Sequence, residues 1–401
     1  MDASDRRWWS ARRATLVAAL ALALGLAVAV VVLSSGSGMR RRAPAPAPTT
    51  TSIPRPPTPP PPGVQLGASV NRLFNDRTNT PANIDRQLRA LQQTGATIAR
   101  SDALWEAAEP SPPIRGVHRY DWTFDDLVAG SLAAHALRWL PIIDYSPSWT
   151  QSIPGRDHSP PRSASDYAAY AAALAARYGP GGSFWSAHRS LVARPADIYE
   201  IWNEPDNPAF WARSPDPARY AELYLLAHQA IKRVDPRSHV VVGGLTKPRS
   251  FLAAMLTDRP ELRGQLDGVG IHPYGPDPST VVDNIRSARL ALRSLGTGGV
   301  VLYVTEFGWT THPKGALNWL PERLRPGYIE RTLAELGHLD CGVPAALVYT
   351  WVTPERDLSN REDWFGINSP GGGATPDAAA FASGLRQATA PGPQVRLCSG
   401  G

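Results

Sequence analysis

The chain has 401 residues, of which 43% are hydrophobic, and its formal net charge is +6. The first 62 residues hold eight arginines against Asp2 and Asp5, whereas the remainder holds 33 basic and 33 acidic side chains. Because the excess positive charge lies in the N-terminal tail, no nucleic-acid partner is expected. The two cysteines, Cys341 and Cys398, exclude a metal site built from CxxC pairs and a disulfide-dense small scaffold.

The N-terminal segment contains an uncharged run over residues 14–33 that is rich in Ala, Leu and Val. Twenty helical residues span about 30 Å, the thickness of a bilayer's hydrocarbon core. We therefore predict a short cytoplasmic tail over residues 1–13 and a transmembrane signal anchor over residues 14–34. A cleaved signal peptide, which would leave a secreted protein, is the alternative, although its apolar region is usually about 7–15 residues long.

A proline-rich linker over residues 35–62 follows the predicted membrane span, with ten prolines between residues 43 and 62. Such a segment forms neither a helix nor a strand ladder and prefers an extended polyproline II conformation. We expect it to hold the domain of residues 63–401 outside a cell membrane that the chain crosses once.

Short apolar runs alternate with amphipathic helical patterns from residue 63 onward. The predicted strands cover 64–71, 96–102, 137–147, 196–206, 239–246, 267–276, 299–311 and 345–354. The predicted helices cover 81–95, 121–136, 163–179, 216–235, 250–258, 279–296, 325–339 and 375–389. Continuously apolar strands are typical of parallel sheets covered on both faces, and eight strand–helix pairs indicate a (β/α)8 TIM barrel in the α/β class. An open, doubly wound sheet is the alternative.

Two glutamates stand out among the carboxylates that end the predicted strands. Glu204 ends the fourth strand and Glu306 the seventh, and the catalytic groups of such barrels lie at these strand ends. The neighbouring aromatic residues are Trp202 and Trp211 for the first, and Tyr303, Phe307 and Trp309 for the second. Burial among aromatics raises a carboxyl pKa, whereas hydrogen-bond donors keep a carboxylate ionised. Two carboxylates in different environments suit glycosidic bond cleavage, and ordinary salt-bridged strand ends are the alternative.

The motifs "IWNEP" and "VTEFGW" resemble the acid/base and nucleophile signatures of clan A glycoside hydrolases, which are retaining enzymes on (β/α)8 barrels. The chain most resembles family 39, in particular its compact bacterial members acting on exopolysaccharides, with family 5 as the runner-up. The family 5 likeness is weakened because many of its members carry a His after the third strand, where this chain has Asp144. The resemblance implies that Glu204 is the general acid/base and Glu306 the nucleophile.

The resemblance also implies a set of residues around the sugar. Asn203 would bind its 2-hydroxyl, Tyr274 of the "HPY" motif would bond the nucleophile, and Trp351 would form the floor of the subsite. The implied substrate-binding residues are Asn203, Arg100, His272, Tyr274, Trp351 and Trp309. Core packing is the alternative for Trp351 and His272.

These residues predict a glycosidase that cleaves O-glycosidic bonds of an extracellular or cell-surface polysaccharide or oligosaccharide by double displacement. A surface carbohydrate-binding protein without turnover and a transglycosylase of wall or capsule assembly are the alternatives. No cofactor and no metal are expected, because no His, Cys or carboxylate cluster has ligand spacing. We expect a monomeric catalytic domain, in which Cys341 and Cys398 form one disulfide near the C-terminus. Two unrelated buried thiols are the alternative to that disulfide.

Overall fold

The computed structural model describes residues 63–399. The predicted tail, membrane span and linker lie outside the described residues. Within residues 63–399, the helices are too short or too polar to cross a bilayer.

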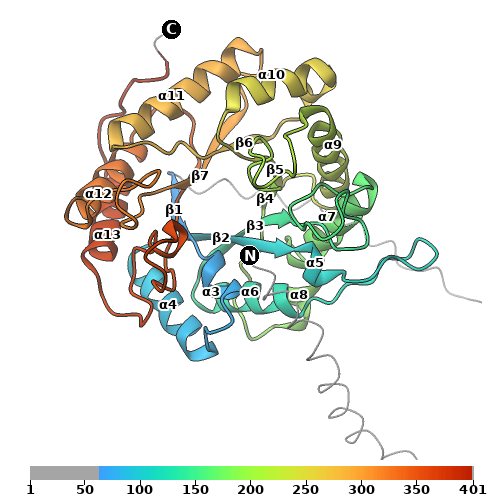
Figure 1. The fold of residues 1–401 in the computed structure, drawn as a ribbon, viewed down its shortest axis with the longest axis horizontal. Helices are drawn as coiled ribbons and strands as arrows, with labels where there is room; N and C mark the ends of the chain where they lie inside the picture. Colours follow the sequence, from blue (N-terminus) through green and yellow to red (C-terminus); the bar gives the residue numbers. More distant parts are fainter. Residues whose placement is uncertain (1–62, 400–401) are drawn as a thin grey trace, which may run out of the picture. The chain divides into compact units, whose positions relative to one another are not determined.

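Eight strands form a closed barrel in which each strand pairs in parallel with the next along the chain, and β1 pairs with β8 (Figure 1). The strands are β1 (Gln65–Ser69), β2 (Ile98–Leu104), β3 (Arg138–Asp144), β4 (Ile198–Ile201), β5 (His239–Leu245), β6 (Gly268–Ile271), β7 (Val301–Phe307) and β8 (Ala345–Val348). The predicted (β/α)8 barrel is confirmed, and the open sheet is excluded. Because all strands run the same way, their C-terminal ends meet at one mouth.

Helices surround the barrel and cover the outer faces of its strands (Figure 1). The longer ones are α4 (Pro81–Gln93), α6 (Thr123–Ala134), α7 (Ala164–Tyr178), α9 (Pro217–Val234), α10 (Pro248–Asp258), α11 (Pro278–Ser294), α12 (Arg325–Leu336) and α13 (Pro376–Thr389). Shorter segments are α3 (Asn71–Asn75), α5 (Trp105–Ala108), α8 (Ser183–Ala187), η2 (Pro260–Gly264), η3 (Glu322–Leu324) and η4 (Arg361–Asp363). Several helices start at a Thr or Asp whose side chain accepts an N–H three residues on, followed by Pro at the first helical position.

The barrel interior is filled near its N-terminal end by a small apolar cluster. Its members are Ile98, Leu140, Ile198, Val241, Tyr303, Ala345 and Leu347. Above this cluster, toward the mouth, the lumen holds charged side chains instead: Arg100 of β2 and Glu200 of β4 are both buried there. The apolar layer therefore fills the N-terminal end of the barrel, and the polar groups lie toward the C-terminal ends of the strands.

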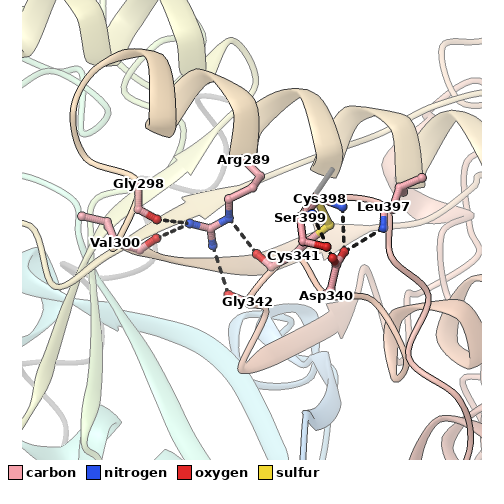
Figure 2. The surroundings of a disulfide bond; sticks show 9 residues. All are labelled: Arg289, Gly298, Val300, Asp340, Cys341, Gly342, Leu397, Cys398 and Ser399. Atoms are coloured by element: carbon pink, nitrogen blue, oxygen red, sulfur yellow. Dashed lines mark hydrogen bonds between the residues drawn. A yellow bond between two sulfur atoms is a disulfide. The ribbon is translucent and has the colours of Figure 1, made fainter. Parts of the chain in front are cut away.

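The C-terminal segment is fastened to the barrel by a disulfide between Cys341 and Cys398, as the sequence predicted. Figure 2 shows the Asp340 carboxylate beside it, accepting hydrogen bonds from the backbone N–H groups of Leu397, Cys398 and Ser399 at 2.8, 2.6 and 2.8 Å. A hydrogen bond from the Ser399 side chain, together with these backbone bonds, lowers the pKa of Asp340. The chain after α13 is thus held by a covalent and a polar contact at the same place.

Candidate active site

The end of β4 places Asn203 and Glu204 at the mouth together. Adjacent residues of a regular strand would face opposite sides of the sheet. Strand β4 ends at Ile201, and Trp202 and Glu204 take φ values of +65° and +42°. Such left-handed conformations are uncommon for residues other than glycine and cluster at functional sites. The predicted fourth strand was therefore too long, because the backbone turns before the motif and so brings both polar side chains to the mouth.

Glu306 enters the site from β7 through a local irregularity of the barrel. The register between β7 and β8 shifts between Val304 and Phe307, so one extra residue is accommodated on β7. As a result, the neighbours Thr305 and Glu306 both reach groups inside the barrel: Thr305 Oγ1 donates to Glu200 Oε1 at 3.0 Å, and Glu306 Oε1 accepts from Arg100 at 2.6 Å.

Arg100 connects three groups beneath the mouth. Its guanidinium donates to Glu200 Oε2 at 2.6 Å, to Glu306 Oε1 at 2.6 Å and to Asn203 Oδ1 at 2.9 Å. Glu200 Oε1 also accepts the backbone N–H of Gly244 at 2.7 Å. Glu200 was not among the predicted site residues because it lies within an apolar strand; its charge at a lumen-facing strand position was the available signal.

His272 and Tyr274, at the end of β6 (Gly268–Ile271), contact the two glutamates; the resemblance implied the Tyr274 contact, whereas it implied that His272 binds the sugar. His272 Nδ1 lies 2.7 Å from Glu204 Oε1 and 3.5 Å from Glu306 Oε2, and the Tyr274 hydroxyl donates to Glu306 Oε2 at 2.8 Å. Asn207 Nδ2 donates to the other oxygen of Glu204 at 2.6 Å. Each oxygen of Glu204 and of Glu306 thus has its own hydrogen-bond partner.

The pKa directions of the two glutamates are the reverse of the simple expectation. Burial raises the pKa of Glu306 above its ordinary value, against the positive charges of His272 and Arg100. Burial also acts on Glu204, but the hydrogen bond and charge of His272 outweigh it and lower the pKa of Glu204. Burial lowers the pKa of His272, but Glu306 and Glu204 outweigh it and raise that pKa above its ordinary value. The contact between His272 Nδ1 and Glu204 Oε1 thus couples the two groups, and a proton at this pair is shared between them.

The two catalytic candidates lie close together. One ligand atom each of Glu204, His272 and Glu306 lies within 4.8 Å of the others. Such a group of three could surround a cation, but the Arg100 guanidinium on Glu306 places a positive charge in the same space. The chemistry of this donor set therefore favours proton transfer and nucleophilic attack over metal binding.

Two predicted sugar contacts are wrong. Trp351 is fully buried: its indole N–H donates to the Gln87 backbone oxygen on α4 at 3.1 Å, and its ring contacts Phe381 of α13. Trp309 is 1% exposed, and its indole N–H donates to the Gly275 oxygen at 2.8 Å. A ring without an exposed face cannot stack on a sugar, so both indoles are packing residues.

Tyr349 is the partly exposed aromatic residue that follows β8. Its hydroxyl donates to Glu362 at 3.0 Å, and its ring packs against Phe365 at a centroid distance of 5.2 Å. Burial, Glu362 and the nearby charge of Glu306 raise the pKa of Tyr349. The aromatic predicted for the subsite was Trp351, two residues later.

The geometry agrees with comparisons to known proteins. A beta-xylosidase of Geobacillus stearothermophilus is 25% identical over 161 residues, which is 35% of this chain and 31% of that relative. A family 39 glycoside hydrolase of Bacteroides cellulosilyticus WH2 superposes with a TM-score of 0.60 at 19% identity, covering 80% of this chain and 64% of that one. The resemblance to clan A glycoside hydrolases is confirmed. No family model matches the chain.

Two further structures agree with this assignment of the fold. A monomeric beta-xylosidase of Caulobacter crescentus CB15 gives a TM-score of 0.59 at 22% identity, covering 80% of this chain and 67% of that one. A family 5 structure of Bifidobacterium longum superposes with a TM-score of 0.60 at 12% identity, covering 82% of this chain and 80% of that one. The aligned region spans about a third of the curated relative, and the chain covers about two thirds of the family 39 structure.

Proposed function

We propose that this clan A-like barrel is a retaining glycoside hydrolase with Glu306 as nucleophile and Glu204 as general acid/base. The observation that carries the proposal is the carboxylate pair: an oxygen of each lies within 4.8 Å of the other. Retaining enzymes keep the two carboxyl groups about 5–5.5 Å apart, whereas inverting enzymes need roughly 6.5–9.5 Å to admit a water. The short separation supports double displacement.

In the first step, the Glu306 carboxylate attacks the anomeric carbon as the glycosidic C–O bond breaks, and the leaving oxygen takes a proton from Glu204. The 2.7 Å contact with His272 Nδ1 lets Glu204 take this proton from the histidine before cleavage and return one to it after the second step. In the second step, Glu204 takes a proton from water, whose oxygen displaces Glu306 from the sugar. The Arg100 and Tyr274 contacts suit Glu306 for its role because both favour the carboxylate that attacks and later leaves.

The proposed substrate is a neutral β-glycoside, such as a β-xyloside unit of a polysaccharide outside the cell. The Geobacillus stearothermophilus relative bears the name beta-xylosidase. Asn203 is placed to bind the sugar's 2-hydroxyl, and Tyr349 is the aromatic available as the floor of the subsite. The predicted signal anchor and the disulfide between Cys341 and Cys398 support an extracytoplasmic, membrane-attached enzyme.

Azide rescue tests the roles of the two glutamates. Glu306→Ala should abolish hydrolysis of 4-nitrophenyl β-xyloside, and azide should restore cleavage with an inverted glycosyl azide as product. Glu204→Ala should retain cleavage of substrates with good leaving groups and form the retained azide. The opposite pattern would reverse the roles. A wild-type enzyme that binds xylo-oligosaccharides without turnover would favour a carbohydrate-binding protein, and sugar transfer to added acceptors in place of hydrolysis would favour a transglycosylase.

A further inference from the structure

A polar cluster at the ends of β1, β2 and β3 is not used by the mechanism above. Its members are Asn71, Asn75, Asp102 and Asp144. Asp102 lies two residues beyond Arg100 on β2, and Asp144 lies four residues beyond Leu140 of the lumen cluster on β3. Because side chains alternate along a strand, both carboxylates share the lumen-facing side with these residues.

The cluster has more hydrogen-bond acceptors than donors. Asn71 and Asn75 donate their amides to the two oxygens of Asp102, the second at 2.6 Å. Asp144 is fully buried close to the Tyr145 hydroxyl, yet neither of its carboxylate oxygens has a hydrogen-bond partner among the described residues, and Asn71 Oδ1 has none either. Buried acceptors without donors are costly, so their retention at a site points to donors that a ligand supplies.

The cluster opens onto the same mouth as the catalytic residues. Asp102 is 7% exposed, close to the values for Asn203 (7%), Glu204 (8%) and Glu306 (7%). Burial raises the pKa of Asp102 and Asp144, and the Arg100 charge, which acts on both, opposes this rise. Arg100 itself contacts Glu306 and Asn203, so Asp102 lies beside the space in which the sugar would react.

We infer that Asp102, backed by Asp144 and Asn71, accepts hydrogen bonds from hydroxyl groups of the sugar whose glycosidic bond is cleaved, and that this subsite rejects uronic acids. The inference rests on the proposed function and adds a specificity determinant to it. Sugar hydroxyls would add a donor to Asp102 and supply the donor that Asn71 Oδ1 lacks. A uronate would bring a further carboxylate beside Glu204, Glu306 and Asp102, which already outnumber Arg100 and His272, the two cationic groups of the site, and like charges in a buried site repel.

The decisive experiment pairs enzyme variants with substrate analogues. We would measure kcat/KM of wild type and Asp102→Ala on 4-nitrophenyl β-xyloside, β-glucoside and their monodeoxy analogues. Asp102→Ala should lower kcat/KM on the parent glycoside about 10- to 100-fold, the range for hydrogen bonds to charged groups. On the analogue that lacks the contacted hydroxyl, the variant and the wild type should be equal within about threefold. An equal loss across the whole deoxy series would overturn the inference.

A matched control separates recognition from the general effect of altering a buried acid. Asp125 on α6 is also buried with one unpartnered oxygen, but it faces Tyr170 in the helical layer. Asp125→Asn should leave the ratio of kcat/KM between the parent glycoside and each deoxy analogue the same as in wild type. Wild-type cleavage of 4-nitrophenyl β-glucuronide as fast as of the β-glucoside would also overturn the inference.

The inference can fail separately from the proposed function. If wild type cleaves none of these glycosides, the hydrolase proposal fails, and binding of free xylose, glucose and glucuronate is then measured by saturation-transfer NMR. Signals for the neutral sugars that Asp102→Ala abolishes and Asp125→Asn retains would still support the subsite. Unchanged signals in Asp102→Ala would overturn it.

Discussion

Gly244 of β5 tests whether His272 acts through Glu204, because a small change there moves the histidine without touching a sugar. A Cβ built on Gly244 would lie 1.9 Å from His272 Nε2, 2.4 Å from its Cδ2 and 2.6 Å from its Cε1. An ordinary contact is roughly 3.5–4 Å, so in Gly244→Ala the buried ring must move by about 1.5 Å or more. Such a displacement breaks the 2.7 Å contact between His272 Nδ1 and Glu204 Oε1.

The expected losses can be stated for stability and for activity. Overpacking of this kind costs about 1–3 kcal/mol of the free energy of unfolding. Misplacement of a catalytic group by about 1 Å can cost roughly 100-fold in rate. Because His272 supplies the proton that Glu204 delivers, kcat/KM of Gly244→Ala should fall most for aryl glycosides with poor leaving groups and little for those with good ones.

The assay is a series of aryl β-xylosides whose phenols differ in pKa, measured with folded protein as judged by urea unfolding. Gly327 on α12 is the control, since its added Cβ would meet no atom within 4 Å. Gly327→Ala should match wild type along the whole series. A loss in Gly244→Ala that does not depend on the leaving group would refute a role for His272 in proton delivery.

The other predictions concern the nucleophile, the buried ion pair and the disulfide. The hydrogen bond from the Tyr274 hydroxyl lowers the pKa of Glu306, so Tyr274→Phe should raise that pKa. Because the nucleophile must be ionised, the variant should lose activity at a higher pH than wild type as the pH falls. The measurement is the pH profile of kcat/KM, whose acidic limb should move to higher pH. Glu200→Gln removes one of the two carboxylates that pair with the buried Arg100 and leaves Glu306 as its partner, so it should cost up to about 3–5 kcal/mol in urea unfolding, and wild-type stability would contradict this. The double variant Cys341→Ser with Cys398→Ser opens a link of sequence separation 57 and should cost up to about 4 kcal/mol; reductant should lower the stability of wild type to that level and leave the double variant unchanged.

The fold and the meeting of Glu204 and Glu306 at one mouth could be predicted because they depend on local, periodic features. Apolar strands and amphipathic helices alternate along the chain, and parallel strands bring their C-terminal ends to one mouth whatever the packing details. Glu204 and Glu306 each follow an apolar run, so the barrel topology alone brings them together. The two cysteines could be paired because two thiols in a domain predicted to be extracytoplasmic favour one link.

The environment of each side chain could not be predicted in the same way. Trp351 and Tyr349 both follow β8, two residues apart, and only the packing against α4 and α13 decides that the tryptophan is buried. Glu200 and Arg100 lie 100 residues apart and meet because they face the same lumen from different strands. The pKa directions of Glu204 and Glu306 likewise depend on the distances to His272 and Arg100, which arise only on folding.

The sequence by itself thus determined the barrel, the order of its elements and the two carboxylates at its mouth, since these follow from periodicity and chain direction. The tertiary structure alone decided which aromatic after β8 is buried, which acids pair with Arg100 and how the two glutamates are hydrogen-bonded. Those properties depend on contacts across the lumen between residues far apart in the chain, where a shift of about 1 Å changes a hydrogen bond into a clash.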